Sequence, residues 1–467
     1  MSNEIRELLK DIVDGESGFV EMRYAGKTSR SVVVERGKVE GASVKRRKGV
    51  GVRVLHEGTW GFSSTGSTDA TSIKKALSRA REAASASAGT RRDRIGDLPP
   101  ADLAQGHFED ASAAEVDAIS LEEKLELARS TEEATRAENP KITSASCAYS
   151  EIDEQKAIVT SDGANSSFRI LRPEFRVQAV AEKNGVLSAA NESVGVTGNW
   201  DCLFSGDRKS KMVSDAVRFA IDLMDAERPA GGRRQVILAP SIVGLLVHEA
   251  IGHTVEADFV QSGSVAAGKI GQRVGSDLVT LCDSGFSEYV AGAGGTIPID
   301  DEGVLTKKTT IIDQGILTSY LHNRESAAHF GVEPTGNARA WEFCDQPIIR
   351  MRNTYLTPGT STLDEMIAGV QDGYLLDGPR NGQADATGEF MFAVQNAWHI
   401  KNGKLGALVK GVTISGVAFD VMKTVDAVSS EFRWDLGSGY CGKGQPAKVD
   451  AGGPYVRCEV LLGGTQE

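Results

Sequence analysis

The sequence predicts an α+β protein, with strand-meander and helix units in its N-terminal half and a large β-rich C-terminal domain that carries one buried helix. Its 52 glycines against 13 prolines favour a turn-rich, β-heavy chain over a helical bundle. Strand-like alternation recurs along the chain and is interrupted by a few amphipathic helical patterns. The length of 467 residues indicates about two to four domains.

The first predicted unit covers residues 1–90. A helix over residues 4–13 precedes four strands separated in part by glycine-containing turns, at residues 19–24, 31–35, 44–48 and 51–55. Asp69 is placed to cap a second helix over residues 70–87. The following segment, residues 89–114, is rich in Arg, Asp, Gly, Pro and Ala, which is typical of a linker or an irregular excursion.

The second predicted unit covers residues 115–227. Ser120 and Glu123 have the spacing of a capping box, so a helix begins there. Strands are expected over residues 143–196, and the apolar spacing after them predicts another amphipathic helix over residues 208–226. This unit therefore repeats the mixture of strands and helices of the first, without a recognisable sequence repeat.

The third predicted unit is the β-rich domain of residues 233–467. The Gly- and Pro-containing stretch 228–232 marks its boundary, and a strand over residues 235–238 follows. Pro240 suits the first turn of a helix. The apolar run at 242–247 indicates that this helix is buried, and most of the remaining domain is predicted to be short strands between Gly, Asn and Asp turns.

Composition and charge exclude several classes of function. A net charge of −12 argues against a nucleic-acid partner, because such binding depends on neutralising phosphates. No apolar run approaches the roughly 18 residues of a membrane span, and the first residues lack a signal-peptide pattern, so we expect a cytoplasmic protein. The six cysteines contain no CxxC pair and are expected to be free thiols or a metal ligand rather than a disulfide framework.

Residues 248–253, His-Glu-Ala-Ile-Gly-His, are the strongest chemical signal. His248 and His253 are two of only seven histidines, and Glu249 lies beside the first, as a zinc hydrolase requires. Five residues of α-helix turn through roughly 500°, which leaves the two rings about 140° apart. Both imidazoles can reach one metal only if the helix widens or ends between them, and Gly252 is where a π-bulge would be easiest.

A catalytic zinc usually takes three protein ligands, so a third must be found. Glu256 and Asp258 lie just beyond His253 in the sequence. They could serve as ligands, as partners that orient the histidines, or only as solvated carboxylates. Cys441 lies among glycines at 437–444, an adaptable backbone, and Lys443 would favour its thiolate. Chemistry alone leaves the choice open between Cys441 and Glu256.

The motif at 248–253, together with Glu-Ala-Asp-Phe at 256–259, resembles the signature of the TldD/PmbA metallopeptidases, in the zinc-bearing TldD-type branch. The resemblance continues through five further motifs, at residues 334–339, 347–351, 353–355, 409–411 and 439–445. These motifs are spread over about half the chain, and their combination is far more specific than the histidine motif alone.

The resemblance implies a zinc ion held by His248, His253 and Cys441, with Glu249 as the general base. It therefore favours Cys441 over Glu256 as the third ligand. It implies a homodimer, or a heterodimer with a zinc-less TldE/PmbA-type chain. Members of the family cleave unfolded or extended peptides, and some complete the maturation of modified peptide antibiotics.

We therefore predict a zinc-dependent peptidase that hydrolyses peptide bonds in unfolded or extended peptides, in peptide maturation or turnover. Glu249 would accept a proton from the attacking water and pass it to the leaving amine. The alternative is a non-catalytic, peptide-binding partner subunit of such a protease, with a vestigial motif. The intact set of His248, Glu249, His253 and Cys441 argues against it. A zinc hydrolase acting on other amides is a third possibility.

Overall fold

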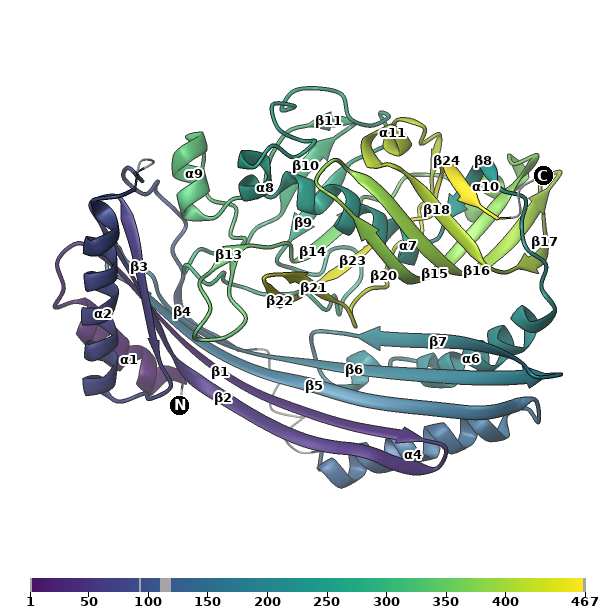
Figure 1. The fold of residues 1–467 in the computed structure, drawn as a ribbon, viewed down its shortest axis with the longest axis horizontal. Coiled ribbons are helices and arrows are strands. Elements are labelled where there is room, and N and C mark those ends of the chain that lie inside the picture. The colour runs from purple at the N-terminus through teal and green to yellow at the C-terminus, as the bar shows by residue number, and fades with distance from the viewer. Residues whose placement is uncertain (1, 92–93, 110–118, 465–467) are drawn as a thin grey trace.

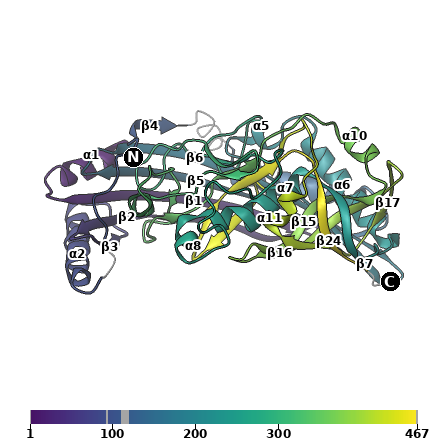
Figure 2. The same cartoon turned by 90° about the horizontal axis from the view of Figure 1, so that it is seen from above.

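A computed structural model describes residues 2–91, 94–109 and 119–464 and confirms the α+β class. The N-terminal half forms one long curved sheet with helices on its outer side, and the C-terminal half lies over the opposite side (Figure 1). Seen from above, the end of the sheet nearest the N-terminus extends beyond the C-terminal half (Figure 2). None of the helices in these ranges has the length and apolarity needed to cross a membrane.

The N-terminal sheet has the strand order β3-β2-β1-β5-β6-β4, and β7 also pairs with β6. Its members are β1 (Phe19–Glu35), β2 (Lys38–His56), β3 (Thr59–Thr65), β4 (Gln105–Glu109), β5 (Ile142–Thr160), β6 (Asn165–Lys183) and β7 (Val186–Gly195). All neighbours are antiparallel except β4 and β6. Because β1 pairs with β5 from Glu21↔Thr160 to Glu35↔Ser146, the strands of both predicted N-terminal units form a continuous sheet.

Within the described ranges the helices of this half are α1 (Ser2–Val13), α2 (Ala70–Ala88), α4 (Leu121–Ala137), the short α5 (Trp200–Leu203) and α6 (Arg208–Asp225). The predicted caps are confirmed: Asp69 accepts from the Ser72 amide, and Ser120 and Glu123 form a capping box. Met22 of β1 packs with α1 and α2, whereas Val32, further along the same face, packs with α4 and α6. The four longer helices thus cover one face of the sheet in two groups.

The prediction of four short strands between residues 19 and 55 is wrong, because they form only the two long strands β1 and β2. Of the glycines between the predicted strands, Gly37 does lie in a turn, but Gly26, Gly41 and Gly49 lie inside β1 and β2. A Cβ on Gly49 would lie 2.5 Å from the Phe343 ring, and one on Gly51 would lie 2.5 Å from the Phe343 carbonyl oxygen. These glycines make room for the C-terminal half rather than bend the chain.

The other face of the N-terminal sheet is buried against the C-terminal half and is rich in charge. Lys156 of β5 donates to Asp301 at 2.7 Å, and Arg172 of β6 donates to Glu154 at 2.6 Å. All four side chains are buried. We call Lys156, Asp301, Arg172 and Glu154 the charged interface. It is one of the surfaces by which the sheet holds the C-terminal half in place.

The C-terminal half contains two larger sheets and two strand pairs. The first larger sheet has the strand order β15-β8-β24-β18-β16-β17, and β19 also pairs with β24. This sheet closes on itself, because β15 also pairs with β16. Its strands are β8 (Gly232–Leu238), β15 (Asp372–Ala384), β16 (Glu389–Lys401), β17 (Lys404–Val409), β18 (Val412–Val417), β19 (Ala427–Val428) and β24 (Val456–Gly463).

The second sheet has the order β11-β10-β9-β14-β23-β20. It consists of β9 (Leu281–Ser284), β10 (Thr309–Asp313), β11 (Ile316–Leu317), β14 (Asn353–Leu356), β20 (Arg433–Trp434) and β23 (Asp450–Gly453). The pairs are β12 (Ala338–Arg339) with β13 (Ile348–Ile349), and β21 (Tyr440–Lys443) with β22 (Gln445–Lys448). The helices are α7 (Pro240–Leu245), α8 (Ala257–Gln261), α9 (Arg324–Phe330), α10 (Leu363–Ala368) and α11 (Ala418–Lys423).

The predicted buried helix begins at Pro240 as α7, and it packs against strands of both larger sheets, β15 of the first and β23 of the second. Ile242, Leu246 and Val247 are almost entirely buried in the largest hydrophobic core. A Cβ on Gly244 would lie 2.8 Å from backbone atoms of β23, so the helix approaches that strand closely. The histidine motif at the end of this helix is therefore held by a rigid core.

Candidate metal centre

The helix widens over the histidine motif. After α7 the chain forms a π-helical segment, Leu246–Gly252, and then a short 3₁₀ turn, His253–Val255. The amide of His253 donates to the carbonyl oxygen of His248, the i to i+5 bond of a π-helix. The two rings consequently lie on one side of the helix, with centroids 5.3 Å apart. The widening expected from the histidine spacing is confirmed.

Gly252 has ordinary right-handed helical angles, φ −54° and ψ −46°, so the widened turn itself does not require a glycine. Close packing does, because a Cβ at this position would lie 1.9 Å from the sulfur of Met351. Gly252 therefore allows Met351 to support the helix directly beneath the motif.

Cys441 reaches the histidines from β21, 188 residues after His253 in the chain. Its Sγ lies 3.0 Å from Nε2 of His253. One ligand atom each from His248, His253 and Cys441 lie within 4.8 Å of one another. No other group of three or more His, Cys, Asp or Glu residues in the described ranges has a comparable arrangement.

His248 provides a test of whether these residues suit a metal. Its side chain is buried, and neither ring nitrogen has a hydrogen-bond partner within the described part of the chain. Buried polar atoms are almost always paired, so a buried imidazole without a well-formed hydrogen bond is suited to a ligand from outside the protein. Two imidazole nitrogens and a thiolate sulfur form a donor set that suits Zn²⁺.

The electrostatics of the three residues favour the form of cysteine that binds metal. Burial alone would raise the pKa of the Cys441 thiol, but His248 and His253 outweigh it and lower the pKa to about 5. Burial opposes the charged form of His253, yet Glu256 and Cys441 raise its pKa to about 10. Cys441 is therefore a thiolate at neutral pH, which is the nucleophilic and metal-ligating form of cysteine.

Glu249 lies at the accessible side of the same group. Its side chain is 32% exposed, and Oε2 lies 3.8 Å from Nε2 of His253. This carboxylate thus faces the region where the donor atoms of His253 and Cys441 meet. It is close enough to act on a water molecule there, and exposed enough for a substrate to approach.

Glu256 and Asp258 have different surroundings. Glu256 is fully buried, and its Oε2 lies 2.8 Å from Nδ1 of His253, so it orients that ring rather than completing the donor set. Asp258 lies 2.7 Å from the Lys443 ammonium. Lys443 also contacts Glu256 at 3.0 Å, so its charge is directed to these carboxylates rather than to the thiolate of Cys441.

A buried arginine fixes the pair of strands that carries Cys441. Arg350 donates through Nη2 to the carbonyl oxygen of Cys441 and through Nη1 to that of Gln445, both at 2.6 Å. Sequence reasoning assigned no role to Arg350. The available signal was its place in one of the motifs on which the family resemblance rests, residues 347–351.

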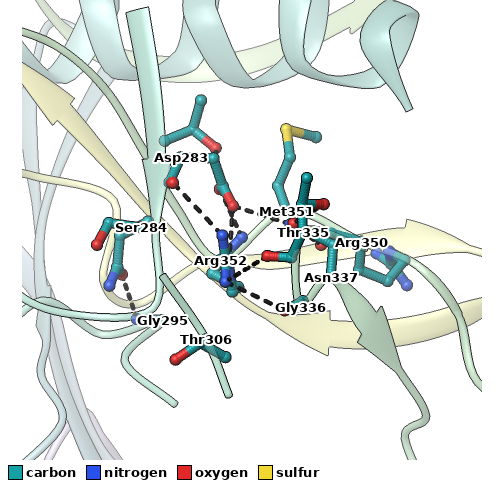
Figure 3. A network of polar contacts seen from close by, with 12 residues as sticks. Asp283, Ser284, Gly295, Thr306, Thr335, Gly336, Asn337, Arg350, Met351 and Arg352 are labelled. Carbon is teal, nitrogen blue, oxygen red and sulfur yellow. Dashed lines mark hydrogen bonds and ion pairs between the residues drawn. The ribbon is translucent and has the colours of Figure 1, made fainter. Parts of the chain in front are cut away.

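A polar network continues beside Arg350 (Figure 3). Arg352 donates from Nε to Asp283 at 2.8 Å. Asn337 donates to Asp283 and to the carbonyl oxygen of Arg350, each at 2.9 Å. Both groups of the pair Arg352–Asp283 are fully buried. The motif at residues 334–339 therefore acts on the centre indirectly, by holding the chain around Arg350 in position.

With this geometry in place, comparison with known proteins places the chain among metallopeptidases. Three profiles match: "PmbA/TldA metallopeptidase domain 1" over residues 20–84, the "central domain" over residues 114–224, and the "C-terminal domain" over residues 231–463. The last of these contains the histidine motif and Cys441.

Curated relatives match nearly end to end. A metalloprotease of Methanocaldococcus jannaschii is 35% identical, and the match covers 94% of this chain and 95% of the relative. A protein of Saccharolobus solfataricus named as a zinc metalloprotease and TldD homologue is 28% identical, and the match covers 95% of this chain and 96% of the relative. Among solved structures, TldE from Thermococcus kodakarensis has the same fold, with a TM-score of 0.79 and 17% sequence identity. The match covers 97% of this chain and 99% of the TldE chain.

Proposed function

Because the chain belongs to the PmbA/TldD metallopeptidase family, we propose that it is a zinc peptidase that hydrolyses peptide bonds in unfolded or extended peptides, during peptide maturation or turnover. One observation carries the proposal. The donor atoms of His248, His253 and Cys441 lie within 4.8 Å of one another, and both ring nitrogens of His248 lack a partner among the described residues.

We assign the roles as follows. His248, His253 and Cys441 would hold a zinc ion, and Glu256 orients His253 through its Nδ1. Zinc held there would supply Lewis-acid chemistry that makes water more acidic and polarises a carbonyl group. Glu249, with its carboxylate 3.8 Å from His253 Nε2, accepts the proton of the attacking water and then delivers it to the leaving nitrogen.

The substrate is proposed to lie extended beside the strand pair that carries Cys441. β21 pairs with β22 alone among the strands of the described ranges, so its main-chain groups other than the Cys441 carbonyl oxygen, which binds Arg350, have no second strand as a partner. Main-chain hydrogen bonds to a substrate are largely independent of side-chain sequence, as an enzyme acting on unfolded segments requires. The exposed side chain of Tyr440 belongs to this strand.

The family resemblance further supports a dimer, formed with a second copy of the chain or with a zinc-less TldE/PmbA-type chain. The similarity to TldE supports only the fold that such a partner would have. Native mass spectrometry of the chain, alone and after mixing with a TldE-type protein from the same cell, distinguishes the two assemblies.

The first test of the function is zinc content, measured by elemental analysis of untagged protein purified without chelator. About one zinc per chain is expected for a single catalytic site, together with cleavage of an unfolded protein but not of small amides. Protein that contains no zinc and takes none up would contradict the proposal. It would then favour the non-catalytic, peptide-binding partner subunit.

A further inference from the structure

One short strand supplies the metal centre with two different side chains. Cys441 and Lys443 are two residues apart on β21, and side chains at this spacing lie on the same face of a strand. Sγ of Cys441 contacts Nε2 of His253 at 3.0 Å, and Nζ of Lys443 contacts Oε2 of Glu256 at 3.0 Å. β21 therefore acts on both sides of the His253 ring, because Glu256 binds the other nitrogen.

Glu256 has a strong requirement for a cation. Its side chain is fully buried, and Oε1 has no hydrogen-bond partner among the described residues, while Oε2 contacts both His253 and Lys443. A histidine that ligates a metal is neutral and supplies a hydrogen bond without charge. The ammonium of Lys443 is then the positive charge paired with this carboxylate, and an unpaired buried carboxylate would be costly.

Lys443 is itself firmly held. Its ammonium also contacts Asp258 at 2.7 Å and the carbonyl oxygen of Ile349 at 3.1 Å, and it lies 4.5 Å from the ring centre of Phe259. The side chain is only 14% exposed. A lysine with these contacts has little freedom to leave Glu256, unlike a solvated surface lysine.

We propose that Lys443 is a positioning residue of the metal centre. It holds the Glu256 carboxylate in contact with Nδ1 of His253, which fixes the orientation of the ring with Nε2 directed toward Cys441. The inference rests on the proposed zinc function and adds to it. The Cys-Gly-Lys order at 441–443 then couples delivery of the thiolate to orientation of a histidine on another element.

The test compares zinc affinity across variants of the full chain, by competition with a chromophoric chelator. Lys443→Met retains the length of the side chain and removes the charge. We expect the zinc dissociation constant to rise about 10–100-fold, with about one zinc bound at saturation, as is typical for loss of an outer partner of a metal ligand. The visible spectrum of the Co²⁺-loaded variant should also change, because the orientation of His253 is altered.

Two further variants separate positioning from simple destabilisation. Lys448→Met removes a lysine of the adjacent strand β22 that is paired with Glu174 at 2.6 Å and is more deeply buried than Lys443. It should lower the unfolding temperature of the metal-free protein but change zinc affinity by less than about twofold, since Lys448 does not touch the zinc ligands or their partners. Lys443→Arg keeps the charge and should bind zinc more tightly than Lys443→Met.

A double-mutant cycle tests whether Lys443 acts through Glu256. In a Glu256→Gln background, Lys443→Met should cost much less zinc affinity than it does in the wild type. Equal zinc affinity of wild type and Lys443→Met, or full additivity in the cycle, would overturn the inference and leave the zinc function standing. A wild-type chain that binds no zinc would overturn both.

Discussion

The metal centre and the charged interface both bury polar side chains, but they satisfy them differently. At the charged interface the Lys156 ammonium contacts Asp301 at 2.7 Å, Glu154 at 3.4 Å and a backbone carbonyl at 2.9 Å. At the metal centre His248 is equally buried, and neither of its nitrogens has a partner within the described ranges. The paired ammonium of Lys156 helps to maintain the fold, whereas an unpartnered imidazole beside a thiol sulfur and a second imidazole indicates where a ligand belongs.

The largest expected effect concerns chemistry at the metal centre. Glu249→Gln should lower kcat for cleavage of an unfolded protein by up to about 10⁴-fold, since it removes the proposed proton acceptor. Zinc content should remain that of the wild type, because Glu249 is not one of the three proposed ligands. Steady-state kinetics on zinc-loaded protein provide the measurement, and an undiminished rate would remove Glu249 from the mechanism.

The next effect concerns the donor set itself. Cys441→Ser should weaken zinc binding by about a thousandfold, which corresponds to about 4 kcal/mol and exceeds the effect expected for an outer partner. Zinc competition titration measures it. Unchanged affinity would indicate that Glu256 is the third ligand after all.

A variant of the charged interface should lower the stability of the fold and leave zinc binding unchanged. Lys156→Met removes the closest cation of the buried Asp301, while Glu154 keeps Arg172, and should lower the free energy of unfolding by about 3 kcal/mol. Zinc affinity should not change. Denaturant unfolding gives the first quantity, and Lys423→Met, which removes an exposed pair with Asp420, is the control, with an expected loss below about 1 kcal/mol. A Lys156→Met protein as stable as the wild type would contradict the view that the charged interface maintains the fold.

Packing beneath the motif gives a smaller effect. Gly252→Ala places a methyl group against the sulfur of Met351 and should cost about 2 kcal/mol of stability through overpacking. In a Met351→Ala background the same substitution should cost much less, because the sulfur it would meet is gone. Thermal unfolding of the single and double variants checks this, and a Gly252→Ala protein as stable as the wild type would show that the helix tolerates a shift.

The smallest expected effect comes from Glu192, a carboxyl group in acidic surroundings. Burial, followed by Asp215 and Asp377, raises its pKa to about 8, whereas the unfolded chain titrates near 4.5. The stability linked to this proton is present below pH 4.5 and is lost as the pH rises through 8. Glu192→Gln should raise Tm by a few degrees at pH 9 and change it less at pH 5, as calorimetry would show. An equal shift at both pH values would contradict this assignment.

Much of the local structure could be predicted from sequence. The caps at Asp69 and Ser120 and the helix start at Pro240 depend on short-range hydrogen bonds and on proline geometry, and all three are confirmed. The strand lengths were predicted wrongly, because Gly49, between the predicted strands 44–48 and 51–55, signals a turn when only neighbours in sequence are considered. Its actual role is close contact with Phe343, almost 300 residues away.

By itself, the sequence determined that the motif helix must widen or end between His248 and His253 if both are to reach one metal, because imidazoles five residues apart cannot share one side of a regular helix. The tertiary structure decided how the site is assembled. It brings Cys441 to His253, turns Lys443 toward Glu256 and places Arg350 behind the strand that carries Cys441. Helix geometry follows from neighbouring residues, whereas these contacts exist only once both sheets and the motif helix have packed together.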